Sequence, residues 1–238
     1  MSKKVYQHIA EELAAQLDAG LFQPGEKLPT ERELAASLRV SRTSLREALL
    51  ALEFNGRIEI RDRAGIFVRP QPAPAEPAFG GDSPPGPYEV LEARRLIEGD
   101  LTYRACLRAS DADLDAIVAA ADAMNRIDID DLATFLSIDR SFHLLIAQAG
   151  GNSVLADVAT SLWDQRDGPL WTTWYQGTRS SENRRRSARQ HAEIATFIKA
   201  RQASAARAAM ERHIDTIIER FLRYGTEATE AAAAASAP

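Results

Sequence analysis

A carboxylate and an imidazole stand four residues apart in the run IDRSFHLLIA, residues 138–147. On a helix, Asp139 and His143 share one face and lie a single turn apart. The residues around them are apolar, so we expect this helix to be largely buried. A structural ion pair explains the spacing, because pairs at i,i+4 are common on helices. A shared metal ion also explains it, if further ligands lie nearby.

Two more histidines are candidate ligands. His191 lies in RQHAEIATFI and His213 in MERHIDTII, each beside the apolar stripe of its expected helix. If these helices pack against the helix of Asp139 and His143, the four groups can converge. Three imidazoles and one carboxylate suit a divalent transition metal such as Zn, Ni, Mn or Fe, with open positions for water or a ligand. Spacing does not fix the packing, so a core role for each histidine stays open.

An ion at these residues could serve three purposes. A metalloenzyme would use it to activate water, but the sequence marks no further carboxylate or histidine as a general base. A structural metal would only hold the fold together. A sensor would use the open positions to receive a small carboxylate. We expect a sensor and no enzyme, because an enzyme would leave residues 1–70 without a role.

The elements that position these residues follow a proline-rich segment, residues 69–87, which carries seven of the 11 prolines. No helix or central strand is expected there. We therefore predict a domain at 1–70, a linker at 71–87, an all-helical domain at 88–225 and a disordered tail at 226–238. The helices expected after the linker span about 88–108, 111–124, 131–149, 152–166, 181–201 and 203–224.

The segment before the linker has the order of a winged helix-turn-helix. Helical spacing over residues 5–19 is followed by PGEKLP, a turn, and by Thr30, which opens the capping-box pattern TERE. Ser41 is the expected N-cap of the next helix, and Gly56 ends it. The runs RIEIR and GIFVRP then predict a hairpin. The fold class is thus mainly α, with a winged helix-turn-helix joined to a helical bundle.

Several residues of this first domain have the chemistry to bind double-stranded DNA. The helix opened by Ser41 presents Arg42, Thr43 and Arg46, and such a helix start can enter the major groove. Arg32 can reach a phosphate. A hairpin tip with Arg61, Arg63 and Gly65 can reach the minor groove. These arginines could instead simply solvate a helix face.

The stretch from PGEKLPTERELAASLRV to GIFV resembles the winged-helix domain of GntR-family transcription regulators. The resemblance rests on LPTERELA, VSRTSLREAL and GIFV, and it implies an operator-binding protein. It also implies that Arg32, Arg42, Arg46 and Gly65 contact DNA, with Ser41 and Thr43 as phosphate or base-edge partners. The family usually has glycine where this chain has Arg39. The substitution costs a little at the helical turn or adds a phosphate contact.

The second half resembles the FadR subfamily of these regulators, over roughly residues 88–224. DRSFH, QHAEI and MERHI match, in order, the metal-binding motifs of its helical effector domain. The resemblance implies that Asp139, His143, His191 and His213 bind one metal ion. It also implies that Arg94 and Asn152 lie near an effector, although Arg94 could pair with Glu98 and Asn152 could cap a helix.

One segment, SLWDQRDGPLWTTWYQ at residues 161–176, resembles hexuronate-utilisation repressors of this family. It implies that Trp163 stacks on a sugar and that Arg166 pairs with its carboxylate. Trp171 and Trp174 could share that role, and each of these residues could instead belong to the core or a dimer interface. Short hydroxy or keto acids remain alternative effectors. We expect a homodimeric repressor that a carboxylate effector releases from DNA.

Composition fits this expectation. The net charge is −5, but residues 1–70 have a balance of +1 and the rest of the chain −6, so any DNA-binding face must come from local clustering. No apolar run is long enough to span a membrane, and the start lacks the apolar block of a secretory signal. The only cysteine, Cys106, cannot form an internal disulfide. We therefore expect a cytoplasmic protein with no membrane partner.

Overall fold

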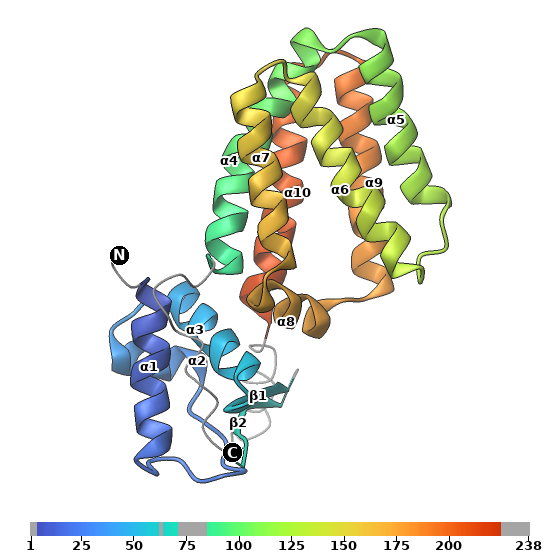
Figure 1. Cartoon of the computed structure of the whole chain (residues 1–238). Helices are drawn as coiled ribbons and strands as arrows, with labels where there is room; N and C mark the ends of the chain where they lie inside the picture. Colours follow the sequence, from blue (N-terminus) through green and yellow to red (C-terminus); the bar gives the residue numbers. More distant parts are fainter. Residues whose placement is uncertain (1–3, 62–63, 71–84, 225–238) are drawn as a thin grey trace, which may run out of the picture. The chain divides into compact units, whose positions relative to one another are not determined.

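The computed structural model describes residues 4–61, 64–70 and 85–224. These residues form two compact units (Figure 1). The first contains the chain up to Tyr88, together with residues 167–178 and the end of the last helix from Glu219. The second contains residues 89–166 and 179–218. The predicted linker and tail lie almost entirely outside the described residues, so the domain boundaries stay predictions.

The first unit has the expected winged helix-turn-helix order. Its elements are α1 (Val5–Asp18), α2 (Glu31–Leu38), α3 (Arg42–Phe54), β1 (Ile58–Arg61) and β2 (Gly65–Val68). The strands pair antiparallel, with Ile58 opposite Val68 and Arg61 opposite Gly65. The buried apolar faces of α1 and α3 form the core of this unit.

The helix starts in this unit follow the predicted caps. The Thr30 hydroxyl accepts from the Glu33 backbone N–H at 3.2 Å, and the Glu33 carboxylate accepts from the Thr30 N–H at 2.9 Å. This is the capping box that TERE predicted. The Ser41 hydroxyl likewise accepts from the Ser44 N–H at 3.1 Å. Arg39 ends α2 in the left-handed conformation, at φ 55°, where glycine is the usual residue.

The second unit is entirely helical in its described residues. Its helices are α4 (Pro87–Arg108, from residue 89), α5 (Asp111–Arg126), α6 (Leu132–Ala149), α7 (Ser153–Asp164), α9 (Ser181–Lys199) and α10 (Ala203–Arg223, up to residue 218). Leu101, Ala147 and Ala159 join α4, α6 and α7 in one buried cluster. Met124, Phe135 and Ala188 join α5, α6 and α9 in another. This packing brings α4, α5, α7 and α9 against α6.

One helix differs from the sequence-based expectation. A short 3-10 turn at Gln165–Asp167 ends the expected helix 152–166, and a further helix, α8 (Pro169–Thr178), follows it. Proline is favoured in the first turn of a helix, where its missing N–H is not needed. Residues 167–178 belong to the first unit. No helix among the described residues is long and apolar enough to cross a membrane.

Candidate functional site

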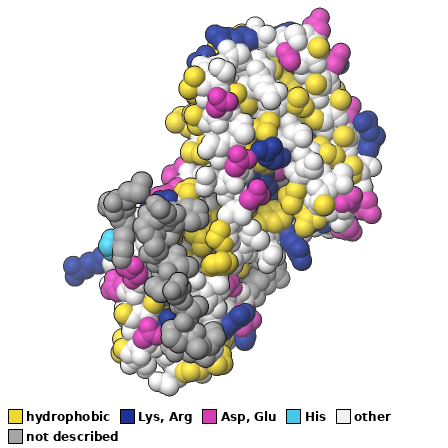
Figure 2. Space-filling model, viewed as in Figure 1, with side chains coloured by type: hydrophobic (Ala, Val, Ile, Leu, Met, Phe, Trp, Pro, Cys, Tyr) yellow, Lys and Arg dark blue, Asp and Glu magenta, His cyan; other side chains and the backbone are white. Residues whose placement is uncertain are grey.

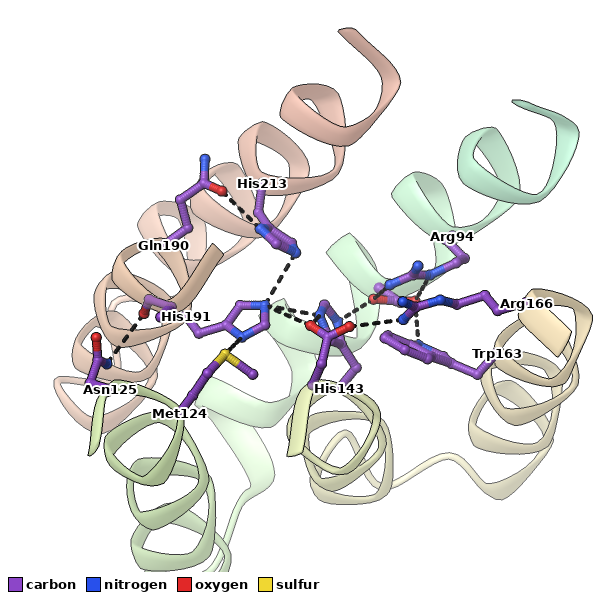
Figure 3. A network of polar contacts seen from close by, with 12 residues as sticks. Arg94, Met124, Asn125, His143, Trp163, Arg166, Gln190, His191 and His213 are labelled. Atoms are coloured by element: carbon purple, nitrogen blue, oxygen red, sulfur yellow. Dashed lines mark hydrogen bonds and ion pairs between the residues drawn. The ribbon is translucent and has the colours of Figure 1, made fainter. Parts of the chain in front are cut away.

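Three helices of the second unit bring three histidines to one point. His143 of α6, His191 of α9 and His213 of α10 are all buried (Figure 3). The Nε2 atom of His191 lies 3.1 Å from Nε2 of His143 and 3.2 Å from Nε2 of His213. A tetrahedral ion with bonds of about 2.0–2.1 Å separates its ligand nitrogens by about 3.3 Å. Two of the three separations are therefore close to that value, and one ring nitrogen from each of the three histidines lies within 4.8 Å of the others, a grouping that could hold one metal ion.

The outer nitrogen of each ring has its own partner. His143 Nδ1 lies 2.6 Å from Glu98 Oε2, and His213 Nδ1 lies 3.0 Å from Gln190 Oε1. His191 Nδ1 lies 3.0 Å from the sulfur of Met124. A carboxylate, an amide oxygen and a thioether sulfur accept hydrogen bonds, so a neutral ring in each of these places carries its hydrogen on Nδ1 and donates it to that partner.

In this form the three rings direct the lone pairs of Nε2 into one buried region, where His191 Nε2 is next to both others. Lone pairs at this separation repel unless a proton or a cation lies between them. Acceptors that bind the outer nitrogen of a histidine and so fix its tautomer are typical of metal sites. The donor set thus fits a divalent transition metal on chemical grounds.

The fourth predicted ligand, Asp139, lies beside these rings. Its Oδ1 is 3.7 Å from His191 Nε2 and 4.0 Å from His143 Nε2. Its other oxygen accepts from Arg166 Nη1 at 2.9 Å. Burial raises the pKa of Asp139, but the opposing effect of Arg166, His191 and His143 is larger and brings the pKa down to about 2. Asp139 is therefore an ionised carboxylate within reach of an ion held by the histidines.

Burial also keeps His191 and His213 in the form that binds metal. Desolvation and the neighbouring His143 lower the pKa of His191 to about 3. Desolvation and His191 lower the pKa of His213 well below its usual value. Neutral imidazole is the metal-binding form, so these rings need no deprotonation at neutral pH.

Beside the histidines, two guanidinium groups lie over one indole ring. The guanidinium carbon of Arg94 lies 4.0 Å from the Trp163 ring centroid, and that of Arg166 lies 4.2 Å from it. The Trp163 Nε1 donates to Glu98 Oε1 at 3.0 Å. Figure 3 shows Arg94, Trp163 and Arg166 gathered on the side of His143 away from His191. Three of the four predicted effector residues are thus close to the predicted metal ligands.

Asn152, the fourth predicted effector residue, caps a helix, which was the alternative role expected for it. Its side-chain oxygen accepts from the Leu155 N–H at 3.2 Å and caps α7. Trp171 and Trp174 are buried and belong to the first unit. There their rings pack edge to face, and Trp174 also contacts Phe221. These tryptophans are core residues of that unit.

Three residues around the histidines escaped the sequence reading: Glu98 as a partner of His143, Gln190 and Met124. Gln190 directly precedes His191 in sequence, yet its side chain serves His213 on another helix. Only the packing of α9 against α10 reveals that pairing. Glu98 carried one signal, its i,i+4 spacing from Arg94, but nothing in its spacing points to α6.

The predicted DNA-contacting residues lie in the first unit. Arg32 and Arg42 are exposed. The Ser41 hydroxyl lies 2.8 Å from that of Thr43. Gly65 has φ 111°, a conformation that favours glycine, and an added Cβ would lie 2.5 Å from the Lys27 side chain. On the described part of the face in Figure 2, charges of both signs are interspersed, in keeping with the nearly balanced charge of residues 1–70.

Arg46 differs from the exposed position that we expected. It is 1% exposed and forms a buried ion pair with Glu31. It also donates to the Phe221 carbonyl at 3.2 Å and to that of Leu222. Carbonyls at a helix C-terminus have no partner within the helix, and they carry partial negative charge. These acceptors explain why a guanidinium is buried here.

Comparison with known proteins agrees with these arrangements. Residues 5–68 match the family described as bacterial regulatory proteins, gntR family, and residues 89–216 match the FCD domain. The Uxu operon transcriptional regulator of Escherichia coli K12 is 33% identical over 85% of this chain and 81% of its own. The Uxu operon regulator of Haemophilus influenzae is 29% identical over 90% and 80%, respectively.

A solved structure shares the fold. Lar, which controls the expression of the Listeria monocytogenes agr system, aligns with a TM-score of 0.50 and 17% identity, over 94% of this chain and 99% of that chain. The histidine-bearing helices α6, α9 and α10 overlap the FCD match, and the winged helix corresponds to the gntR match. The chain belongs to the GntR family of DNA-binding transcription regulators, with an FCD effector domain, and not to an enzyme family.

Proposed function

We propose that this regulator is a homodimeric repressor that releases its operator when a carboxylate effector binds beside a metal ion. Two recognition helices would read a short palindrome, in keeping with two-fold symmetry. The proposed DNA contacts are Arg32, Ser41, Arg42, Thr43 and Gly65. Arg46, which is buried against Glu31, is left out. Release requires that the effector bind the DNA-free state more tightly than the DNA-bound state.

The metal proposal rests on one observation, the convergence of one ring nitrogen from each of three buried histidines. His143, His191 and His213 would hold the ion, with Asp139 as the fourth ligand. Such an ion supplies a Lewis-acid centre with open coordination positions. Zn, Ni, Mn and Fe all accept imidazole and carboxylate ligands.

Charge supports a carboxylate as the effector. Among the described residues around the histidines, Arg94 and Arg166 balance the carboxylates of Glu98 and Asp139. A divalent ion then adds two positive charges to a buried site, where uncompensated charge is costly. An anionic ligand on the ion lowers that cost. The proposed site therefore favours a small anion over a neutral sugar.

A hexuronate, or its keto isomer, is the effector that we favour. Trp163, an aromatic side chain of the kind that packs against sugars, lies beside His143, and Arg166 lies over its ring. Arg166 is also close enough to Asp139 to exchange that partner for a ligand carboxylate. The relatives named as Uxu operon regulators agree with this choice, as does the resemblance of residues 161–176 to hexuronate-utilisation repressors.

Exposed apolar side chains support the homodimer. Leu96 and Leu107 project from α4, and Val154 and Val158 project from α7, a helix that packs against α4. A second copy would cover this surface. We expect Leu96→Asp to convert the dimer to a monomer in light scattering. Leu21→Asp, at an equally exposed leucine of the first unit, should leave the dimer intact.

Thermal unfolding against hexuronates, aldonates and short hydroxy acids, with and without prior chelation, tests the effector. A ligand that binds only the folded state raises the midpoint temperature of unfolding. At a concentration of 100 times its Kd, it adds about 2.7 kcal/mol to the free energy of unfolding. We expect one hexuronate to raise it and chelation to abolish the effect. A rise that survives chelation would make the metal structural. A rise with a short hydroxy acid alone would replace the hexuronate, and no rise with any ligand would overturn the carboxylate effector.

A further inference from the structure

We propose that Glu98 is a positioning residue that sets the metal affinity of this site, because it holds His143 in the tautomer that can bind an ion. The inference rests on the proposed metal site but concerns a residue outside the ligand set. Glu98 lies on α4, whereas the four proposed ligands lie on α6, α9 and α10.

Both oxygens of Glu98 are fully engaged. Oε1 accepts from Arg94 Nε at 2.6 Å and from Trp163 Nε1 at 3.0 Å. Oε2 accepts from His143 Nδ1 at 2.6 Å and lies 3.4 Å from Arg94 Nη2. The residue is 2% exposed. An ion pair with Arg94 alone would need only one turn of α4, so the contacts with α6 and α7 call for a further role.

The contact with His143 decides which of two states its ring adopts. A carboxylate only accepts hydrogen bonds, so a neutral His143 must carry its hydrogen on Nδ1, which leaves the Nε2 lone pair toward His191. If the hydrogen moved to Nε2, it would bridge the 3.1 Å to His191 Nε2. The two rings would then pair with each other, and neither of those two nitrogens would be available to an ion. Glu98 favours the open state.

The same carboxylate also orients the indole ring beside the site. Its bond to Trp163 Nε1 fixes the plane of a ring that both Arg94 and Arg166 cover. One buried acid thus ties a metal ligand to the surface proposed for the effector. Second-shell partners of this kind typically change metal affinity by about 10–100-fold when they are removed.

Glu98→Gln is the sharpest variant, because it keeps the shape and removes the charge. Its amide oxygen can still accept from Arg94 and Trp163, but its NH₂ group faces His143 Nδ1. That donor requires a lone pair on Nδ1 and moves the hydrogen to Nε2. Asp100→Asn is the matched control, since Asp100 pairs with Arg104 at i,i+4 on the same helix but is far more exposed.

In the experiment, full-length protein is first freed of metal with a chelator. It is then titrated with Co²⁺ or Zn²⁺ against a competing chelator, at a temperature well below the midpoint of thermal unfolding. We expect Glu98→Gln to bind about 10–100-fold more weakly than the unchanged protein, and Asp100→Asn to bind as it does. Glu98→Asp, which keeps the charge on a shorter chain, should fall between them. If Glu98→Gln fails to fold, the affinity of Glu98→Asp still tests the proposal.

Nitrogen NMR of the imidazoles in the chelated protein separates this inference from the metal proposal. We expect His143 to carry its hydrogen on Nδ1 in the unchanged protein and on Nε2 in Glu98→Gln. Failure of the unchanged protein to bind either ion would overturn the metal site while the NMR arm still tests Glu98. Equal affinity and an unchanged tautomer in Glu98→Gln, with only a lower midpoint, would reduce Glu98 to a structural residue.

Discussion

The two units use the same kinds of side chain in opposite ways. At the histidine site of the second unit, arginines, carboxylates and imidazoles are buried, and they contact partners from other elements. At the start of α3 in the first unit, Arg42 and Ser41 are exposed, and the nearest partners of Ser41 are its own helix neighbours. The buried network must contain its partners, because water cannot replace them. The exposed side chains at the start of α3 need no such partners in the free protein, because water solvates them until DNA binds.

This difference predicts how substitutions divide between stability and binding. Removing a buried charged group leaves its partner unpaired, so the folded state loses free energy. Removing an exposed arginine leaves stability within about 0.5 kcal/mol and affects only the complex. Arg46 tests the rule, because it lies on the recognition helix but is buried.

The largest effect is expected at Arg46. Arg46→Ala leaves Glu31 and two carbonyls of α10 without a guanidinium, and breaking a buried pair costs about 3–5 kcal/mol. Urea denaturation measures this loss. Replacing Arg46 and Glu31 together by leucine should restore part of it. A single variant as stable as the unchanged protein would show that Arg46 is open to solvent and free to meet DNA.

His191 is expected to give the next largest effect. It is the central ring, within 3.2 Å of both other histidines. His191→Ala should weaken Zn²⁺ binding by at least about 100-fold, since even second-shell changes reach that size. Competition with a chelator measures the affinity. His8→Ala is the control, because His8 is exposed on α1 in the other unit. If His191→Ala and His8→Ala had the same zinc affinity, zinc would bind elsewhere.

Arg42 should affect binding without affecting stability. Arg42→Ala is expected to cost about 1–3 kcal/mol of operator affinity, the usual value of an arginine contact to a base edge. Fluorescence anisotropy with operator DNA at fixed salt measures it. Arg185→Ala, at an exposed arginine of α9, should leave the affinity unchanged. If both variants bind equally well, Arg42 is only a solvated residue of the helix surface.

The sequence predicted the first unit more completely than the site of the second. Caps such as Thr30 and Ser41 act within a few residues, so their patterns can be read locally. The metal-ligand candidates were found by residue type and family resemblance. Their second shell was not found, because Glu98 and Gln190 reach ligands on other helices. The burial of Arg46 was missed for the same reason, since its acceptors at residues 221 and 222 are far away in sequence.

The smallest effect is expected at Arg39, where the chain departs from its family's glycine. Arg39 has φ 55°, and a side chain in that conformation costs about 1–2 kcal/mol. Replacement by glycine removes this cost, but part of the gain is lost because glycine makes the unfolded chain more flexible. Arg39→Gly should therefore stabilise the protein by up to about 1 kcal/mol, as measured by urea denaturation.

Arg201 is the matched test of that prediction. Its φ of 57° is nearly the same, but its guanidinium donates to the carbonyls of Cys106 and Ala109 at 3.1 and 2.7 Å. Arg201→Gly relieves the same backbone cost and loses both bonds, each worth about 1 kcal/mol. We expect it to gain nothing or to destabilise. Equal gains at both positions would mean that the bonds of the second unit add no more to stability than an exposed side chain does, which contradicts the contrast between the two units.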